Sequence, residues 1–250
     1  MKLLGDGDSN TKLAKSNRLS KFLTFGLSLA PADVSGYQTC SSSSGGCRKA
    51  CIFTKGLGGV FASIPASRIR KTQLFFENRP EFVRQLRKDL HSALRKAKRQ
   101  GKRCAIRLNV FSDLQWESLA PWIFAEFPQI QFYDYTKHYL RMRRFCRGEL
   151  PTNYHLTFSR SESNERRAIE ILMLGGNVAT VFERTSRYNP TIPAEWHGFP
   201  VVDGDKTDLR FLEGTQGKVI GLYFKGNSDD STGFVVPLAD ARQPLLSAIT

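Results

Sequence analysis

The residues with the clearest chemical potential are three cysteines in a short polar loop. Cys40, Cys47 and Cys51 follow the spacing C-x6-C-x3-C, and only serines and glycines separate the first two. A loop so poor in apolar residues has no packing reason to hold three thiols, and thiolates bind zinc and iron–sulfur clusters. Structural zinc takes four ligands, whereas three cysteines suit a [4Fe–4S] cluster that keeps one iron open. We predict such a cluster; the alternatives are unmetallated thiols, or zinc completed by the remote His155 or His197.

The remaining cysteines and the start of the chain indicate the compartment. We interpret Cys104 as a core residue of a strand and Cys146 as a structural residue. Met1–Leu4 is interrupted at once by Gly5–Asp8, so no signal peptide is expected. No apolar run approaches the roughly 20 residues that cross a bilayer. We therefore expect a cytoplasmic protein without membrane contact, whose thiols are reduced or bound to metal.

Apolar segments separated by turn signals predict the elements that position these residues. Seven strands are expected, at residues 22–29, 104–110, 130–135, 154–159, 178–182, 200–203 and 219–224. Most of the segment 68–103 is predicted as one helix with Pro80 in its first turn and Gly101 at its end, and a short helix is predicted over 164–174. This alternation predicts an α/β fold with a mostly parallel sheet, as a single-domain full or partial (β/α) TIM-like barrel. The barrel domain is expected over residues 21–250, after a polar N-terminal segment of residues 1–20.

Polar side chains gather where several predicted strands end. In a barrel these ends share one mouth, which is where such folds hold their active sites. Acid–base and substrate-binding groups are therefore predicted among seven residues: Asp113, Glu117, Asp134, Lys137, Asp203, Asp205 and Lys225.

The charge balance points to a polyanionic partner. The chain has 37 Lys and Arg against 23 Asp and Glu, a net charge of +14, and much of the excess lies along the helix within 68–103. A second basic cluster interleaved with aromatic residues follows around residue 140. Such surfaces also serve simply to solvate a helix, but two clusters favour contact with the phosphates of DNA or RNA. The predicted contacts are Arg84, Lys88, Arg95, Lys98, Lys102, Arg141 and Arg144.

Nearly the whole chain resembles a bacteriophage family catalogued as a numbered gene product. The resemblance is carried by the cysteine array and by the segments Leu29–Ala32, Arg68–Glu77, Arg107–Asn109, Ser112–Glu117, Asp203–Asp205 and Asp208–Arg210. It implies a phage origin, and hence the cytoplasm of the host cell, together with the barrel fold.

The order of a first strand, a three-cysteine loop and further β/α units also resembles radical S-adenosylmethionine (SAM) enzymes. The segments Gln131–Arg143 and Thr157–Asn164 look like the third-strand and fourth-strand regions of radical-SAM-like phage proteins. The usual spacing in that superfamily is C-x3-C-x2-C, from which this chain departs, and its Gly-Gly-Glu motif is absent.

This second resemblance implies roles for particular residues. The three loop cysteines would hold a [4Fe–4S] cluster whose open iron binds SAM. Ser112, with Asp113 and Glu117, would occupy the place of the motif that binds the amino group of SAM. Ser159 and Asn164 would approach the ribose of the cofactor, and the acidic residues and lysine that follow the later strands would face the substrate.

Three functions are compatible with these features. The first is an iron–sulfur, radical-SAM-like enzyme that modifies a base or sugar of a nucleic acid. The second is a barrel transglycosylase that inserts a deazaguanine into DNA or tRNA, with Asp113, Asp134 or Asp203 as its nucleophile. Such enzymes carry their cysteines late in the chain, which counts against this reading. The third is a nucleic-acid-binding protein with a structural metal and no catalytic activity.

Overall fold

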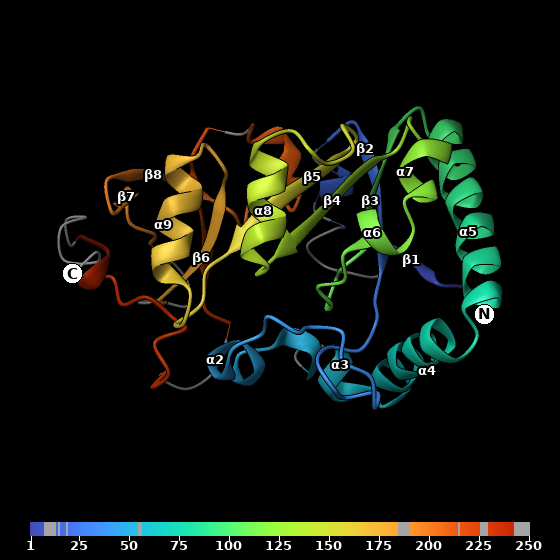
Figure 1. The fold of residues 1–250 in the computed structure, drawn as a ribbon, viewed down its shortest axis with the longest axis horizontal. Helices are drawn as coiled ribbons and strands as arrows, with labels where there is room; N and C mark the ends of the chain where they lie inside the picture. Colours follow the sequence, from blue (N-terminus) through green and yellow to red (C-terminus); the bar gives the residue numbers. More distant parts are fainter. Residues whose placement is uncertain are drawn as a thin grey trace.

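The computed structural model describes residues 1–7, 14, 16–18, 20–54, 57–184, 191–214, 216–225 and 230–242. It shows a mixed α/β fold built on a nine-stranded sheet with the order β1-β2-β3-β4-β5-β6-β9-β8-β7 (Figure 1). The strands are β1 (Leu4–Asp6), β2 (Phe22–Leu27), β3 (Arg103–Arg107), β4 (Gln131–Thr136), β5 (Tyr154–Ser159), β6 (Val178–Phe182), β7 (Glu195–Trp196), β8 (Phe199–Asp203) and β9 (Val219–Tyr223). All seven predicted strands are present; two have the predicted bounds, and the ends of the others differ by at most three residues.

The direction of the strands determines where the loops lie. Strands β2 to β6, β9 and β8 are parallel to their neighbours, while β1 and β7 are antiparallel at the two edges. The carboxyl ends of the seven parallel strands therefore lie along one edge of the sheet. The predicted α/β class with a mostly parallel sheet is confirmed.

The first residues belong to the sheet rather than to a separate polar segment. Leu3 and Leu4 are buried, and β1 pairs with β2 through Leu4 and Leu27. Ser16 and Asn17 are also buried, and Asn17 Oδ1 accepts a hydrogen bond of 2.7 Å from the Thr24 amide. Residues on the N-terminal side of the predicted boundary after residue 20 therefore complete an edge of the sheet.

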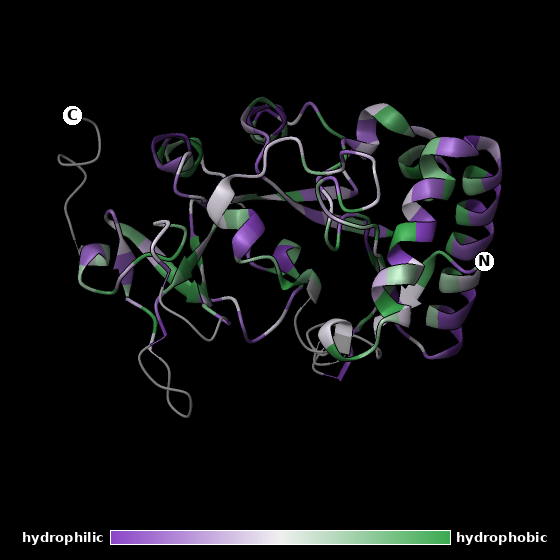
Figure 2. Cartoon of the chain, turned by 90° about the horizontal axis from the view of Figure 1, so that it is seen from below, coloured by the Kyte–Doolittle hydropathy of each residue, from purple (hydrophilic) through white to green (hydrophobic). Residues whose placement is uncertain are grey.

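The basic segment forms two helices. Among the residues that the structure describes, the α-helices with given bounds are α2 (Gly45–Lys49), α3 (Leu57–Val60), α4 (Ser63–Glu77), α5 (Arg79–Arg99), α6 (Trp116–Leu119), α7 (Trp122–Glu126), α8 (Tyr139–Cys146) and α9 (Glu165–Met173). Helix α5 begins after Asn78, whose side chain accepts a hydrogen bond from the Glu81 amide, and Pro80 occupies its first turn. The predicted helix with Pro80 in its first turn is thus α5, while residues 68–77 belong to α4. Hydrophilic and hydrophobic residues alternate along both (Figure 2). No helix among the described residues is long and apolar enough to cross a membrane.

The two faces of the sheet are covered differently. The larger core packs helix residues such as Phe82 and Ile169 against strand residues such as Ile106 and Phe158. A smaller cluster on the opposite face joins Phe22, Ala105, Tyr133 and Leu209 and is extended by Phe211. The chain that follows β8 therefore covers the face that the helices leave open. Cys104 is buried in β3, as predicted.

Candidate functional site at the cysteine loop

Asp113 joins three of the loops that follow the parallel strands. Its amide donates a hydrogen bond of 2.8 Å to the carbonyl of Thr39, which lies after β2. Its carboxylate accepts from the Lys137 amide, after β4, at 2.8 Å and from Arg141 Nη1 at 3.2 Å. Asp113 was predicted as an acid–base group. Its hydrogen bonds make it a residue that positions the loops after β2, β3 and β4.

Arg141 lies inside the protein and is not available to a nucleic acid. Its side chain has no exposed surface, and Nε and Nη2 each donate to a carboxylate oxygen of Glu117 at 2.8 Å. Nη2 also donates to the Tyr154 hydroxyl at 2.6 Å. Burial alone would lower its pKa, but Tyr154, Glu117 and Asp113 raise the pKa of Arg141 above its ordinary value. Arg141 was predicted as a phosphate contact and Glu117 as a catalytic group; in the structure the two form a buried ion pair with each other.

Asp134 is part of the same buried network. It is fully buried, accepts from the Asn109 amide at 2.6 Å and accepts from the Tyr154 hydroxyl at 2.7 Å. Burial raises the pKa of Asp134 to about 7, against the opposing effect of the hydrogen bond from Tyr154. Asp134 was predicted as a catalytic group; in the structure its carboxylate is fully buried and hydrogen-bonded to Asn109 and Tyr154.

The cysteine loop is held against the end of β5 by one carboxylate. Glu162 accepts from the Gly46 amide at 2.7 Å and from the Ser44 hydroxyl at 2.8 Å. Ser44 in turn caps α2 by accepting from the Cys47 amide at 3.2 Å. Partial burial would raise the pKa of Glu162, but the hydrogen bonds from Gly46 and Ser44 lower it below its usual value.

Gly46 is packed closely between two segments that are distant in sequence, one at Glu162 and one at residues 232–234. A Cβ atom at this position would lie 2.4 Å from Thr232 Oγ1 and 2.8 Å from both Glu162 Oε2 and Phe234 Cβ. The chain around residue 233 is held there by Arg160, whose Nη1 donates to the carbonyls of Gly233 and Phe234 at 2.6 and 2.9 Å. Any larger side chain than glycine would therefore push α2 away from the loops that support it.

The three thiols share this edge of the sheet. Cys40 Sγ donates to the Phe111 carbonyl at 3.3 Å, and all three side chains are partly buried. Burial raises the pKa of both Cys40 and Cys51, and the neighbouring Cys47 adds to the rise in each, so it lies within electrostatic range of the other two. Within the described ranges, no three His, Cys, Asp or Glu side chains converge closely enough to hold a metal ion.

Among the residues predicted to be catalytic, Lys137 lies within electrostatic range of the thiol of Cys51. Its Nζ donates to Ser159 Oγ at 2.7 Å and lies 5.7 Å from the centre of the Phe234 ring. Its charge also lowers the pKa of Cys51, although burial outweighs this effect. A cation, a hydroxyl and thiols from the loops after β2, β4 and β5 therefore meet at one place.

Ser112 and Asn164, predicted to bind a cofactor, stabilise turns instead. Ser112 Oγ donates to Asn109 Oδ1 at 2.8 Å. Asn164 accepts from the Ser161 amide at 2.7 Å and donates to the Ser159 carbonyl at 3.1 Å. Their polar atoms are committed to the backbone around them, so of the three predicted cofactor contacts only Ser159 faces the cysteine loop.

Asp203, Asp205 and Lys225 form a separate group after β8 and β9. Lys225 Nζ lies 2.8 Å from Asp205 Oδ1, and Asp203 Oδ1 accepts from the Asp205 amide at 2.8 Å. The cysteines follow β2, and four strands, β3 to β6, lie between β2 and β9 in the sheet. The order of the strands therefore does not place this group next to the cysteines.

The histidines offered as remote zinc ligands have other surroundings. His197 Nε2 lies 3.2 Å from Glu165 Oε1. The ring of His155 packs against Phe145 of α8, and burial lowers the pKa of His155 to about 4. Cys146, near the same helix end, is partly buried against the main core, in keeping with a structural role.

The exposed basic residues differ in how far they are neutralised. Arg84 forms an ion pair with Glu81, and Arg144 forms one with Glu149. Lys102 Nζ donates to the carbonyls of Asn17 and Ser20. The other predicted contacts, Lys88, Arg95 and Lys98, are exposed and have no acidic partner within the described residues.

The comparison with protein families gives one match, which spans residues 2–237 and is described as Gene product 88. The chain belongs to the Gene product 88 family. This agrees with the phage gene-product family expected from the sequence. No curated protein and no solved structure matches the chain. The match to the Gene product 88 family includes every residue of the site described above. Two of these residues, Glu162 and Phe234, were not predicted from the sequence. Each is identified only by its contacts with residues that are distant in the chain, Gly46 and Lys137.

Replacing Arg141 tests the buried network. Arg141→Met keeps the volume but leaves Glu117 and Asp113 without their cationic partner, so we expect the free energy of unfolding to fall by about 3–5 kcal/mol. Urea unfolding followed by circular dichroism measures this change. Arg144→Met on the same helix removes an exposed arginine and should change it by less than about 0.5 kcal/mol. Equal effects of the two substitutions would contradict the assignment.

Replacing Glu162 tests how the cysteine loop is held. Glu162→Gln removes the charge that accepts from Gly46 and Ser44, so hydrogen exchange of the Gly46 amide should become about tenfold faster. Alkylation of Cys47 should accelerate as well, whereas Glu149→Gln should leave both rates unchanged. Unaltered exchange at Gly46 in the Glu162 variant would show that this carboxylate does not hold the loop.

Proposed function

We propose that the chain is an iron–sulfur enzyme of the radical-SAM type that modifies a nucleic acid. The proposal rests above all on where the cysteines stand: all three occupy the segment directly after β2, the first parallel strand, at the carboxyl edge of the sheet. Active sites of barrel enzymes are built at this edge from the loops after successive strands. Lys137 and Ser159 reach the same place from β4 and β5.

The proposal includes a partial (β/α) barrel. In its support, the strands β2 to β6 neighbour one another in the order in which they occur along the chain. Helices α5, α8 and α9 fall between consecutive parallel strands and pack on one face. The residues that follow β8 fill the other face through Leu209 and Phe211, as side chains fill the interior of a small barrel.

The donor set suits a cluster that needs three thiolates. Burial keeps Cys40 and Cys51 protonated in the absence of a bound cation, and the mutual repulsion of three thiolates requires a positive centre among them. The serines and glycines between Cys40 and Cys47 leave this segment with few side-chain restrictions on its backbone. Electron transfer to a bound cofactor is the chemistry that an iron–sulfur cluster supplies in this setting.

The surrounding residues would bind and orient rather than exchange protons. Lys137 Nζ presents a positive charge and hydrogen-bond donors beside Ser159, which suits an anionic group such as the carboxylate of SAM. Asp113 holds the Lys137 backbone in place. Phe234 covers one side of the lysine and limits the access of water.

The nucleic-acid substrate is supported by charge. The net charge of +14 and the exposed cations of α5 favour a polyanion. Base exchange finds less support, because Asp113 is ion-paired with Arg141 and Asp134 is enclosed, so neither offers a free nucleophilic carboxylate.

Metal analysis of the intact protein tests the proposal. Protein purified without oxygen should be brown, contain about four iron atoms per chain and lose its visible absorbance on reduction with dithionite. Cys40→Ser, Cys47→Ser and Cys51→Ser should each lose most of the iron. Cys146→Ser is the matched control and should retain it.

Three results would overturn the assignment. Stoichiometric zinc in a colourless protein would indicate a structural metal, and iron content that is equal in all four serine variants would exclude the loop as the ligand. Protein free of both metals after anaerobic purification would remove the basis for radical chemistry.

A further inference from the structure

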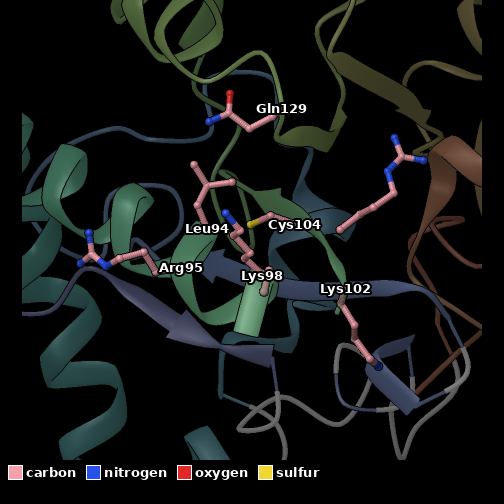
Figure 3. A pocket seen from close by; sticks show the side chains of 8 residues that line it. Leu94, Arg95, Lys98, Lys102, Cys104 and Gln129 are labelled. Carbon is pink, nitrogen blue, oxygen red and sulfur yellow. The ribbon is translucent and has the colours of Figure 1, made fainter. Parts of the chain in front are cut away.

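A hollow of about 350 Å³ lies at the opposite end of the sheet from the cysteine loop (Figure 3). It is formed by the last turns of α5, by the start of β3 at Arg103 and Cys104, and by Gln129. The cysteine loop follows the carboxyl end of β2, and β3 runs parallel to β2. The hollow is therefore at the amino end of the strands, and it belongs to a different surface from the thiols.

The lining combines an apolar floor with a basic rim. Leu94, Ala97 and Cys104 supply the apolar part, and Ala97 and Cys104 are buried beneath it. Four of the eight lining residues are cationic and none is acidic: Arg95, Lys98, Lys102 and Arg103. Figure 3 shows Lys98 and Cys104 among the residues that line the hollow, with Arg95 and Lys102 extending away on opposite sides.

Most of this positive charge is not neutralised by the protein. Arg87, on the same helix, forms an ion pair with Glu126. By contrast, Arg95, Lys98 and Arg103 make no ion pair with any acidic residue in the described ranges. Arg103 instead lies over the ring of Phe22, with 4.8 Å between its guanidinium carbon and the ring centre. Cations gathered around an apolar floor attract a ligand that has both a negative charge and an apolar surface.

We infer that this hollow binds one nucleotide unit of a single-stranded nucleic acid. A flat base would lie on Leu94 and Ala97, and the phosphates beside it would contact Arg95 and Lys98. The volume falls in the range of small-ligand sites. In a duplex, the bases are stacked and paired, so only an unpaired base can reach such a floor. The inference rests on the nucleic-acid part of the proposed function and does not involve the metal.

Helix α5 connects this hollow with the other end of the sheet. Its 21 residues span about 31 Å at 1.5 Å per residue. The exposed Lys88 lies between Arg95 and the start of the helix, which follows α4 and the cysteine segment in the chain. A strand anchored by one nucleotide in the hollow can thus extend along α5 toward the thiols.

Binding of a fluorescent thymidine octamer, followed by anisotropy at several salt concentrations, tests the inference. Substitution of both Arg95 and Lys98 by Gln should weaken binding roughly tenfold. It should also reduce the slope of log K against log salt by about 1.4, which is about 0.7 for each cation lost from contact with a single strand. The matched control, Arg166→Gln with Arg167→Gln on α9, removes the same charge and should leave both quantities close to the wild-type values.

Cross-linking of wild-type protein gives a readout that does not depend on variants. An octamer containing 4-thiothymidine should cross-link on irradiation to peptides that include residues 94–104. Thymidine monophosphate should compete for this cross-link if a free nucleotide occupies the hollow, and only the octamer should compete if a strand is needed. Inorganic phosphate that competes as well as either would show a site for anions alone and would overturn the inference.

The outcomes separate this inference from the proposed function. Equal weakening by the α5 and α9 variants, or cross-links confined to other peptides, would reject the hollow as the site while nucleic-acid binding remained. Wild-type protein that binds neither octamer nor mononucleotide would reject both the hollow and the nucleic-acid substrate. The iron content of the same preparation would still decide the metal centre independently.

Discussion

The position of one carboxylate, that of Asp113, determines how the loops at the carboxyl edge of the sheet meet. Through its backbone amide and two oxygens it contacts the loop after β2, the loop after β4 and helix α8 at once. Arg141, on α8, is buried, and it also forms an ion pair with Glu117 and donates a hydrogen bond to the Tyr154 hydroxyl. Burying a guanidinium is favourable only when several acceptors surround it, so the loops cannot shift separately without leaving a charge unpaired. The cysteine loop and Lys137 are thereby supported on a rigid base.

The same constraint engages three of the acidic residues that lie in or just after the central strands. Asp113 and Glu117 neutralise Arg141, and Asp134 is enclosed beneath them. What remains at the edge is a lysine, a serine hydroxyl and three thiols, a set better suited to holding an anion and a metal than to general acid–base catalysis. The carboxylate of Glu162, just after β5, accepts hydrogen bonds from Ser44 and Gly46 and so joins the cysteine loop to the loop that follows Ser159.

Much of the fold could be predicted from the sequence, because hydrophobic periodicity is local. The seven central strands and α5 follow directly from it, whereas β1 and β7 span three and two residues and are too short to give a periodic signal. The location of the cysteines at a strand end was also predictable. The roles of Asp134 and Arg141 were not, because 20 residues separate Asp134 from Tyr154 and only the register of β4 against β5 brings them together. Composition likewise could not distinguish a buried arginine from the exposed ones that surround it.

The net charge of the chain is best understood through this distribution of pairs. Asp208, a buried acid on the other face of the sheet, is neutralised by Arg107 at 3.0 Å. Glu117 and Asp113 likewise form ion pairs with the buried Arg141. The negative charges of these three acids are therefore not available to neutralise the cations of the surface. Along α5 the positive charges are neutralised unevenly. Arg84 and Arg87 form ion pairs with glutamates, whereas the cations that line the hollow at the end of the helix form none with the described acidic residues. An excess that follows from general solubility would be spread evenly over the surface. Four of these surface cations instead line one hollow whose floor is apolar, so the excess is locally concentrated at the end of α5.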